Sequence, residues 1–176
     1  MSARRPLDLG GDPSFAHAAP TGADAMTLTR RRALAVLAAA LAPLGAARAA
    51  GPTIEVWKTP TCGCCDAWVA HMETAGFAPV VFDVDGATMS DLKRRIGLTP
   101  DRASCHTAFV DGYLVEGHVP AEDVLRLLAE RPDAAGLAVP GMPIGSPGME
   151  MGDERERYDV LLLRRDGRAE VFATHG

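Results

Sequence analysis

The chain has 176 residues, of which 47% are hydrophobic and 23% charged; this composition suits a compact domain and excludes a disordered chain. Its net charge of −5 argues against binding to nucleic acid or to anionic lipid. Only four cysteines occur, and three of them lie within four residues, which excludes a scaffold held by dispersed disulfides and indicates redox chemistry or metal binding.

The first 49 residues have the pattern of an export leader. Three arginines at 30–32 precede a stretch rich in Ala, Leu and Val at 33–47, and Ala-Arg-Ala at 47–49 resembles a cleavage site. The apolar stretch is shorter than the roughly 20 residues that a spanning helix needs, although an uncleaved anchor is the alternative. We therefore predict a signal peptide of the Sec or twin-arginine type, with Met26 as the better placed start. The mature domain, residues 50–176, is expected in the periplasm without stable membrane insertion.

Loss of this leader makes the remaining domain more acidic. Residues 1–49 hold six of the 18 basic and three of the 23 acidic residues, which leaves 12 and 20 and a net charge of about −8. A surface of this sign mildly favours cations and does not suggest a nucleic-acid partner.

The mature part predicts a regular succession of strands and helices. Alternating apolar residues predict strands, and apolar residues at helical spacing predict helices. The predicted elements are a strand at 53–58, a helix at 66–75, a strand at 79–84, a short helix at 90–96, a strand at 106–110, its hairpin partner at 113–117, a helix from Pro120 to Arg131, a loop over 132–157 and a hairpin of 158–163 with 168–173. Ser90 or Thr88 is expected to cap the short helix.

From residue 53 to residue 131 this order is strand, helix, strand, helix, strand, strand, helix, which is the order of a thioredoxin fold. The fold class we predict is therefore α/β, thioredoxin-like, with an added C-terminal β-hairpin. In that fold a cysteine motif stands where the first strand turns into the first helix, beside the loop that enters the third strand. Cys105 and His106 are therefore expected to face the cluster of residues 62–65.

The cluster combines CxxC spacing with one extra cysteine. At a helix N-terminus the macrodipole and free N–H groups stabilise the thiolates of Cys62 and Cys65, which serves both disulfide exchange and metal binding. The adjacent Cys64 and Cys65 have Cα atoms about 3.8 Å apart, too close for an ordinary disulfide. Cys62 and Cys65 are therefore the candidate redox pair when no metal is bound. A simple stabilising disulfide is the alternative reading.

Sulfur ligands select copper(I) or zinc. Cys62, Cys64, Cys65 and Cys105 could form a tetrahedral zinc site, but three ligands within four residues crowd a single ion. Bridging thiolates suit two or more copper(I) ions better, so copper(I) is the predicted metal and zinc the alternative.

Four further residues are weaker ligand candidates. His106 adjoins Cys105 and is a ligand candidate; the alternative is a strand residue whose side chain points away from the cluster, because successive side chains of a strand alternate. His118 lies at the end of the hairpin and is a ligand candidate or a turn residue. Met149 and Met151 carry thioethers, which suit copper(I) in an oxidising compartment, or they pack the loop against the domain.

Four segments in order resemble the CopG-type proteins, which are periplasmic, thioredoxin-like, metal-binding proteins associated with copper resistance. The segments are WKTPTCGCC at 57–65, SCHT at 104–107, EGHVP at 116–120 and GMPIGSPGME at 141–150. The resemblance spans about residues 53–173 and implies copper handling, with the family's cysteine ligands falling on Cys62, Cys64, Cys65 and Cys105. It implies copper ions as partners, with other periplasmic copper-handling proteins as further candidates. Storage, redox and delivery roles stay open.

Two other functions compete with copper binding: a thiol–disulfide oxidoreductase and a zinc-stabilised interaction module. An oxidoreductase of this fold usually has a cis-proline opposite its CxxC pair. The matching loop here is Ser104-Cys105-His106, without a proline immediately before the strand. This difference favours the metal hypothesis.

Overall fold

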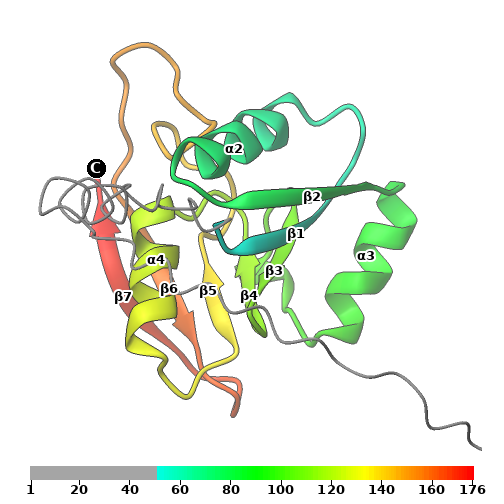
Figure 1. The fold of residues 1–176 in the computed structure, drawn as a ribbon, viewed down its shortest axis with the longest axis vertical. Helices are drawn as coiled ribbons and strands as arrows, with labels where there is room; N and C mark the ends of the chain where they lie inside the picture. Colours follow the sequence, from blue (N-terminus) through cyan, green and yellow to red (C-terminus); the bar gives the residue numbers. More distant parts are fainter. Residues whose placement is uncertain (1–50) are drawn as a thin grey trace, which may run out of the picture. The chain divides into compact units, whose positions relative to one another are not determined.

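The computed structural model describes residues 51–176, so the predicted leader, its cleavage site and Met26 lie outside the described residues. Figure 1 shows the elements in chain order. They are β1 (Thr53–Lys58), α2 (Gly63–Thr74), β2 (Ala78–Asp83), α3 (Gly86–Arg95), the 3-10 turn η2 (Pro100–Arg102), β3 (Thr107–Val110), β4 (Tyr113–Glu116), α4 (Ala121–Glu130), β5 (Gly136–Ala138), β6 (Tyr158–Leu163) and β7 (Ala169–His175). No helix among these residues is long and apolar enough to cross a membrane.

All seven strands form one mixed sheet in the order β2-β1-β3-β4-β5-β6-β7. β1 runs parallel to β2 and β4 runs parallel to β5, whereas the other neighbours are antiparallel. Successive residues of a strand face opposite sides, so each strand sends one set of side chains to each face of the sheet. In β1, for example, Ile54 and Val56 are fully buried and Trp57 lies on the other face.

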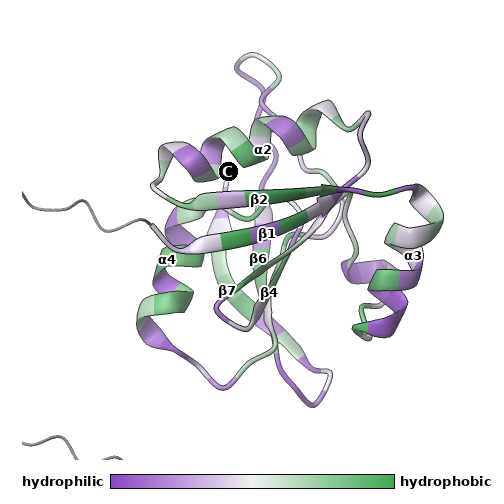
Figure 2. Ribbon diagram, turned by 45° about the vertical axis from the view of Figure 1, so that its right-hand side comes forward, coloured by the Kyte–Doolittle hydropathy of each residue, from purple (hydrophilic) through white to green (hydrophobic). Residues whose placement is uncertain are grey.

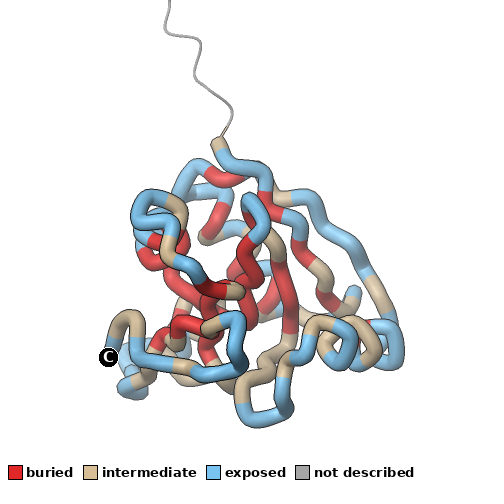
Figure 3. The backbone as a smooth tube through the Cα atoms, turned by 90° about the horizontal axis from the view of Figure 1, so that it is seen from below, coloured by how far each residue is buried: buried red, intermediate tan, exposed pale blue. Residues whose placement is uncertain are grey.

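Helices α2 and α4 cover the face that carries Ile54 and Val56. Their side chains Trp68, Met72 and Leu127 belong to the same buried cluster as these strand residues. Figure 2 shows hydrophobic residues along much of the strands, and Figure 3 shows the buried segments gathered in the middle of the domain. The cysteine motif at the N-terminus of α2 is therefore anchored on a well-packed helix.

The single helix α3 lies against the opposite face. Its Lys93 reaches Thr107 and Glu116, which stand beside each other on β3 and β4 and face away from the main core. The Met89 sulfur of the same helix lies 3.7 Å from the Thr107 hydroxyl oxygen. The contact between α3 and these strands bears on the candidate site, because Cys105 and His106 directly precede β3 and His118 follows β4 by two residues.

The predicted order of elements from the first strand to the third helix is observed, and the C-terminal hairpin is present as β6 and β7. Two details of the prediction were wrong. The segment 132–157 is not entirely a loop, because β5 joins β4 to β6 at the centre of the sheet. Three residues are too few to show any alternation, and β5 is buried throughout. The helix α3 also begins at Gly86 rather than near Ser90, and neither Ser90 nor Thr88 caps it. The N-cap is Asp85, whose carboxylate accepts a hydrogen bond from the Thr88 N–H at 2.7 Å.

Candidate metal centre

The cysteine motif occupies the turn from β1 into α2, as the order of elements predicts. The chain reverses over residues 59–62, where the Cys62 N–H donates to the Thr59 carbonyl at 3.1 Å. Cys62 is the N-cap of α2, and Cys64 and Cys65 lie in its first turn. The cysteines are thus placed at the positive end of the helix macrodipole, where negative charge on sulfur is stabilised.

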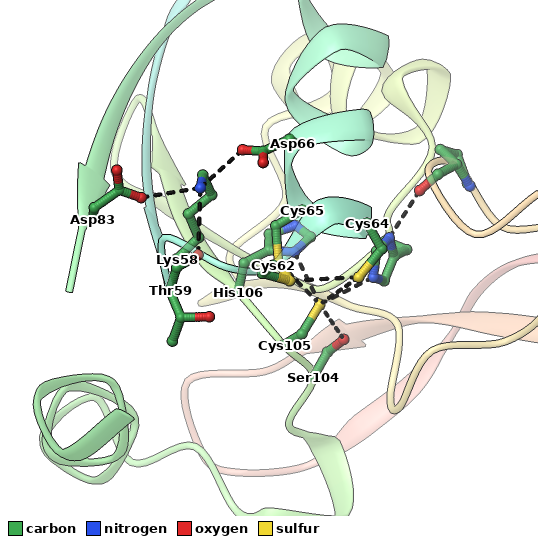
Figure 4. The surroundings of a disulfide bond; sticks show 12 residues. Lys58, Thr59, Cys62, Cys64, Cys65, Asp66, Asp83, Ser104, Cys105 and His106 are labelled. Atoms are coloured by element: carbon green, nitrogen blue, oxygen red, sulfur yellow. Dashed lines mark hydrogen bonds and ion pairs between the residues drawn. A yellow bond between two sulfur atoms is a disulfide. The ribbon is translucent and has the colours of Figure 1, made fainter. Parts of the chain in front are cut away.

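Four sulfur atoms meet at this turn (Figure 4). A disulfide joins Cys62 and Cys65, the pair that the spacing predicts, and Cys64 and Cys105 are free thiols. The Cys105 Sγ lies 3.4 Å from the Cys65 Sγ and 3.9 Å from the Cys64 Sγ, and the Cys62 and Cys64 sulfurs are 3.5 Å apart. All four lie within 4.8 Å of one another, so the structure brings Cys105 into the cluster.

A second group of potential ligands shares Cys105 with the sulfur cluster. It consists of Cys105, His106 and His118, whose candidate ligand atoms also lie within 4.8 Å of one another. The Cys105 Sγ is 3.1 Å from the His118 Nε2 and 3.4 Å from the His106 Nδ1. Cys105 therefore belongs both to the cluster of four sulfurs and to the group that contains the two imidazoles.

The surroundings of His118 orient its ring. Its Nδ1–H donates to the Pro147 carbonyl at 2.8 Å, which leaves the lone pair of Nε2 directed at Cys105. Burial lowers the pKa of His118, so the ring is neutral at physiological pH. A histidine whose other ring nitrogen donates to a carbonyl has the usual orientation of a metal ligand.

His106 is fully buried and sits under Trp68, with ring centroids 4.4 Å apart. Burial, and then the neighbouring His118 and Lys93, lower its pKa well below the usual value. Its Nε2 is a buried atom without a hydrogen-bond partner among the described residues. The ring is therefore held by packing, with only Nδ1 turned to Cys105.

The thiol of Cys105 is protonated at neutral pH. Its pKa is raised to about 12, first by burial and then by the nearby Cys64. A metal ion that binds this sulfur must displace that proton.

The methionine-containing loop packs on the motif through a glycine. A Cβ added to Gly148 would lie 2.6 Å from the Cys64 carbonyl oxygen and 2.8 Å from the Trp68 nitrogen, so the loop backbone lies directly against the first turns of α2. Met149 follows this contact and is half-buried. Met151 is 60% exposed and forms an isolated bridge with Glu154.

Two charged groups near the cluster escaped the sequence analysis. Lys58 is buried at the end of β1 and forms ion pairs with Asp66 at 2.8 Å and Asp83 at 3.0 Å. Glu116 is fully buried on β4 and pairs with Lys93. Ile54, Val56 and Lys58 alternate along β1 and face the interior of the domain. This alternation in the sequence indicates that Lys58 is buried.

A family model and two solved structures match this chain. A family model described as "Protein of unknown function, DUF411" matches residues 102–149, which include Cys105, His106 and His118. A solved structure named "Copper resistance protein copG- Form 2" is 47% identical, with a TM-score of 0.67, over 72% of this chain and 99% of that chain. A second, "Copper resistance protein copG- Form 1", is 48% identical, with a TM-score of 0.66, over 70% of this chain and 96% of that chain. No match was found among curated proteins.

Proposed function

Since the chain belongs to the CopG-type copper-resistance family, we propose that it is a periplasmic copper-binding protein of copper resistance, which holds copper(I) in a cluster of cysteine thiolates on a thioredoxin-like scaffold. The ligands are Cys62, Cys64, Cys65 and Cys105. His118 is the strongest additional candidate, followed by His106. Met149 and Met151 are the weakest; of these, Met149 directly follows Gly148, whose backbone packs on the motif.

The convergence of the four sulfurs is the observation that carries this proposal. They come from two segments about 40 residues apart in sequence and lie within 4.8 Å of one another. Soft thiolate ligands prefer copper(I) among the common cellular metals, together with zinc. The imidazoles add neutral nitrogen donors without adding charge.

More than one copper ion fits this donor set best. Four thiolates on a single copper(I) would leave a large negative charge in a half-buried site, whereas several ions that share sulfurs neutralise it. The N-terminus of α2 stabilises part of the remainder. Zinc is the alternative metal, bound as a single tetrahedral ion.

The Cys62–Cys65 pair supplies a redox step as well. When these two thiols close their disulfide, they release two electrons and two protons. The two electrons reduce two copper(II) ions to copper(I). A thiol–disulfide oxidoreductase acting on proteins is the second candidate function, favoured by the disulfide at the helix N-terminus. The third sulfur in the motif and Cys105 favour the metal over a protein substrate.

Copper(I) titration of the reduced protein tests the proposal. Under a competing copper(I) chelator, the wild type should bind at least two ions, and Cys64→Ser should bind fewer because it loses a bridging sulfur while the side chain keeps nearly the same size. Saturation of the wild type at a single ion, or equal copper content in both proteins, would overturn the proposal and favour the oxidoreductase.

Copper(I) affinity should rise with pH between about 6 and 8. The raised pKa of Cys105, about 12, means that this thiol still holds its proton over the whole range, and copper must displace it. Each displaced proton adds up to about tenfold in apparent affinity per pH unit. The histidines release none above neutrality, because burial lowers their pKa values. Affinities measured at three pH values with the same chelator check this, and a pH-independent affinity would contradict it.

A further inference from the structure

The loop that carries Cys105 is tied to its neighbours on both sides of that residue. On one side, the Ser104 N–H donates to the Glu116 carboxylate at 2.7 Å. On the other side, the His106 carbonyl accepts from the Gly117 N–H at 3.1 Å. Both partners lie at the end of β4, so Cys105 is fixed between two attachments to the same strand.

The Glu116 carboxylate is the centre of the first attachment. It is fully buried and receives hydrogen bonds from three donors, one on α3 and two that flank Cys105 in the sequence. The donors are the Ser104 N–H and the Lys93 ammonium on Oε1, and the Thr107 hydroxyl at 2.7 Å on Oε2. A buried charge of this kind is stable only when it is paired and its lone pairs are used, and this arrangement meets both conditions.

We infer that Glu116 is a positioning residue for Cys105: its buried carboxylate, neutralised by Lys93 of α3, holds the Ser104 N–H and thereby keeps the Cys105 sulfur within reach of the motif. The effect on copper rests on the proposed function, whereas the effect on the position of Cys105 does not. Among the described residues Glu116 makes no hydrogen bond to the sulfur atoms, so it acts through the Ser104 backbone.

The negative charge of Glu116 is essential to this role because all three of its partners donate. A glutamine would offer one acceptor oxygen, for which the Ser104 N–H and the Lys93 ammonium would compete. It would also leave the Lys93 charge largely buried, at 13% side-chain exposure, without a counter-ion. The double variant Lys93→Met with Glu116→Gln removes the competitor. In that variant the glutamine oxygen can accept from Ser104 and its amide can donate to Thr107.

The first experiment measures the position of Cys105 without copper. In the oxidised protein only Cys64 and Cys105 are free thiols, and peptide mapping after brief alkylation with iodoacetamide gives the ratio of their modification rates. Glu116→Gln should raise the ratio of Cys105 to Cys64 by about tenfold, because the freed loop opens more often. The double variant should return the ratio towards the wild-type value.

Asp123→Asn is the matched control. Asp123 is also a buried carboxylate with a hydrogen-bonding partner, the His175 Nε2 at 2.7 Å, but it lies on α4 and makes no hydrogen bond to the Cys105 loop among the described residues. This variant should lose stability and leave the alkylation ratio unchanged. If Glu116→Gln leaves the ratio at the wild-type value, or if Asp123→Asn raises it as much, the inference is wrong.

The second experiment separates this inference from the proposed function. In copper(I) titrations, Glu116→Gln should lower the affinity by about 10- to 100-fold and weaken the sulfur-to-copper charge-transfer absorption. If the wild type binds several ions and Glu116→Gln binds them equally well, the inference fails and the proposed function stands. If the wild type binds none while the alkylation ratio still changes, the proposed function fails and the role of Glu116 stands.

Discussion

Oxidised protein, with the Cys62–Cys65 disulfide closed, should bind at most one copper(I) ion, whereas the fully reduced protein should bind at least two. A disulfide sulfur carries no negative charge and is a poor ligand for the metal. Closing the bond therefore removes two of the four thiolates from the cluster. The two that remain, on Cys64 and Cys105, lie 3.9 Å apart. Two metal–sulfur bonds of about 2.3 Å can span that distance around a single ion.

The oxidised protein should also bind that remaining ion at least about 100-fold more weakly than the reduced protein binds copper(I). This is the upper part of the range seen when a metal site loses supporting groups. Anaerobic titration of both redox forms, with thiols counted in parallel, measures the difference. The double variant Cys62→Ser with Cys65→Ser is the control, since it cannot form this disulfide and its copper content should not respond to oxidation. Equal copper content in the reduced and oxidised wild type would exclude a cluster that depends on Cys62 and Cys65.

The position of Cys105 could be predicted because it depends on the order of elements alone. Each of the elements from β1 to α4 has a strong local signal, and their order places the loop before β3 beside the turn before α2. This prediction does not require that Cys105 or the cysteines of the motif make any particular side-chain contact. The same reasoning explains why the gathering of the four cysteine sulfurs could be predicted from the sequence.

The supporting contacts could not be predicted in the same way. His118 is oriented by the main-chain carbonyl of Pro147, and a carbonyl has no sequence signature. The role of Glu116 depends on Lys93 of a helix on the opposite face of the sheet from the main core, and nothing in either segment indicates that the two meet. Likewise, β5 has only three residues, too few for a sequence pattern. It is a strand because it pairs with β4 on one edge and with β6 on the other.

Gly148→Ala should detach the loop at residues 145–149 from α2 and lower copper affinity. The glycine has a φ of +83°, where an alanine costs about 1–2 kcal/mol. The added Cβ would also lie 2.6 Å from the Cys64 carbonyl oxygen and 2.8 Å from the Trp68 nitrogen. Both are backbone atoms of α2 and cannot turn aside, so a further 1–3 kcal/mol, roughly the cost of overpacking, is expected. The loop must move, and the Pro147 carbonyl that orients His118 moves with it.

Gly152→Ala separates these two costs. Gly152 has a similar φ of +64°, but no atom lies within 4 Å of the position of its Cβ, so this variant carries the backbone strain without the collision. Denaturant unfolding should show a loss of about 1–2 kcal/mol for Gly152→Ala and of about 2–5 kcal/mol for Gly148→Ala, from the same two sources. Only Gly148→Ala should also weaken copper(I) binding, because only there is His118 released. Equal losses of stability in the two variants, with copper affinity unchanged in both, would show that the contact between Gly148 and α2 does not support the site.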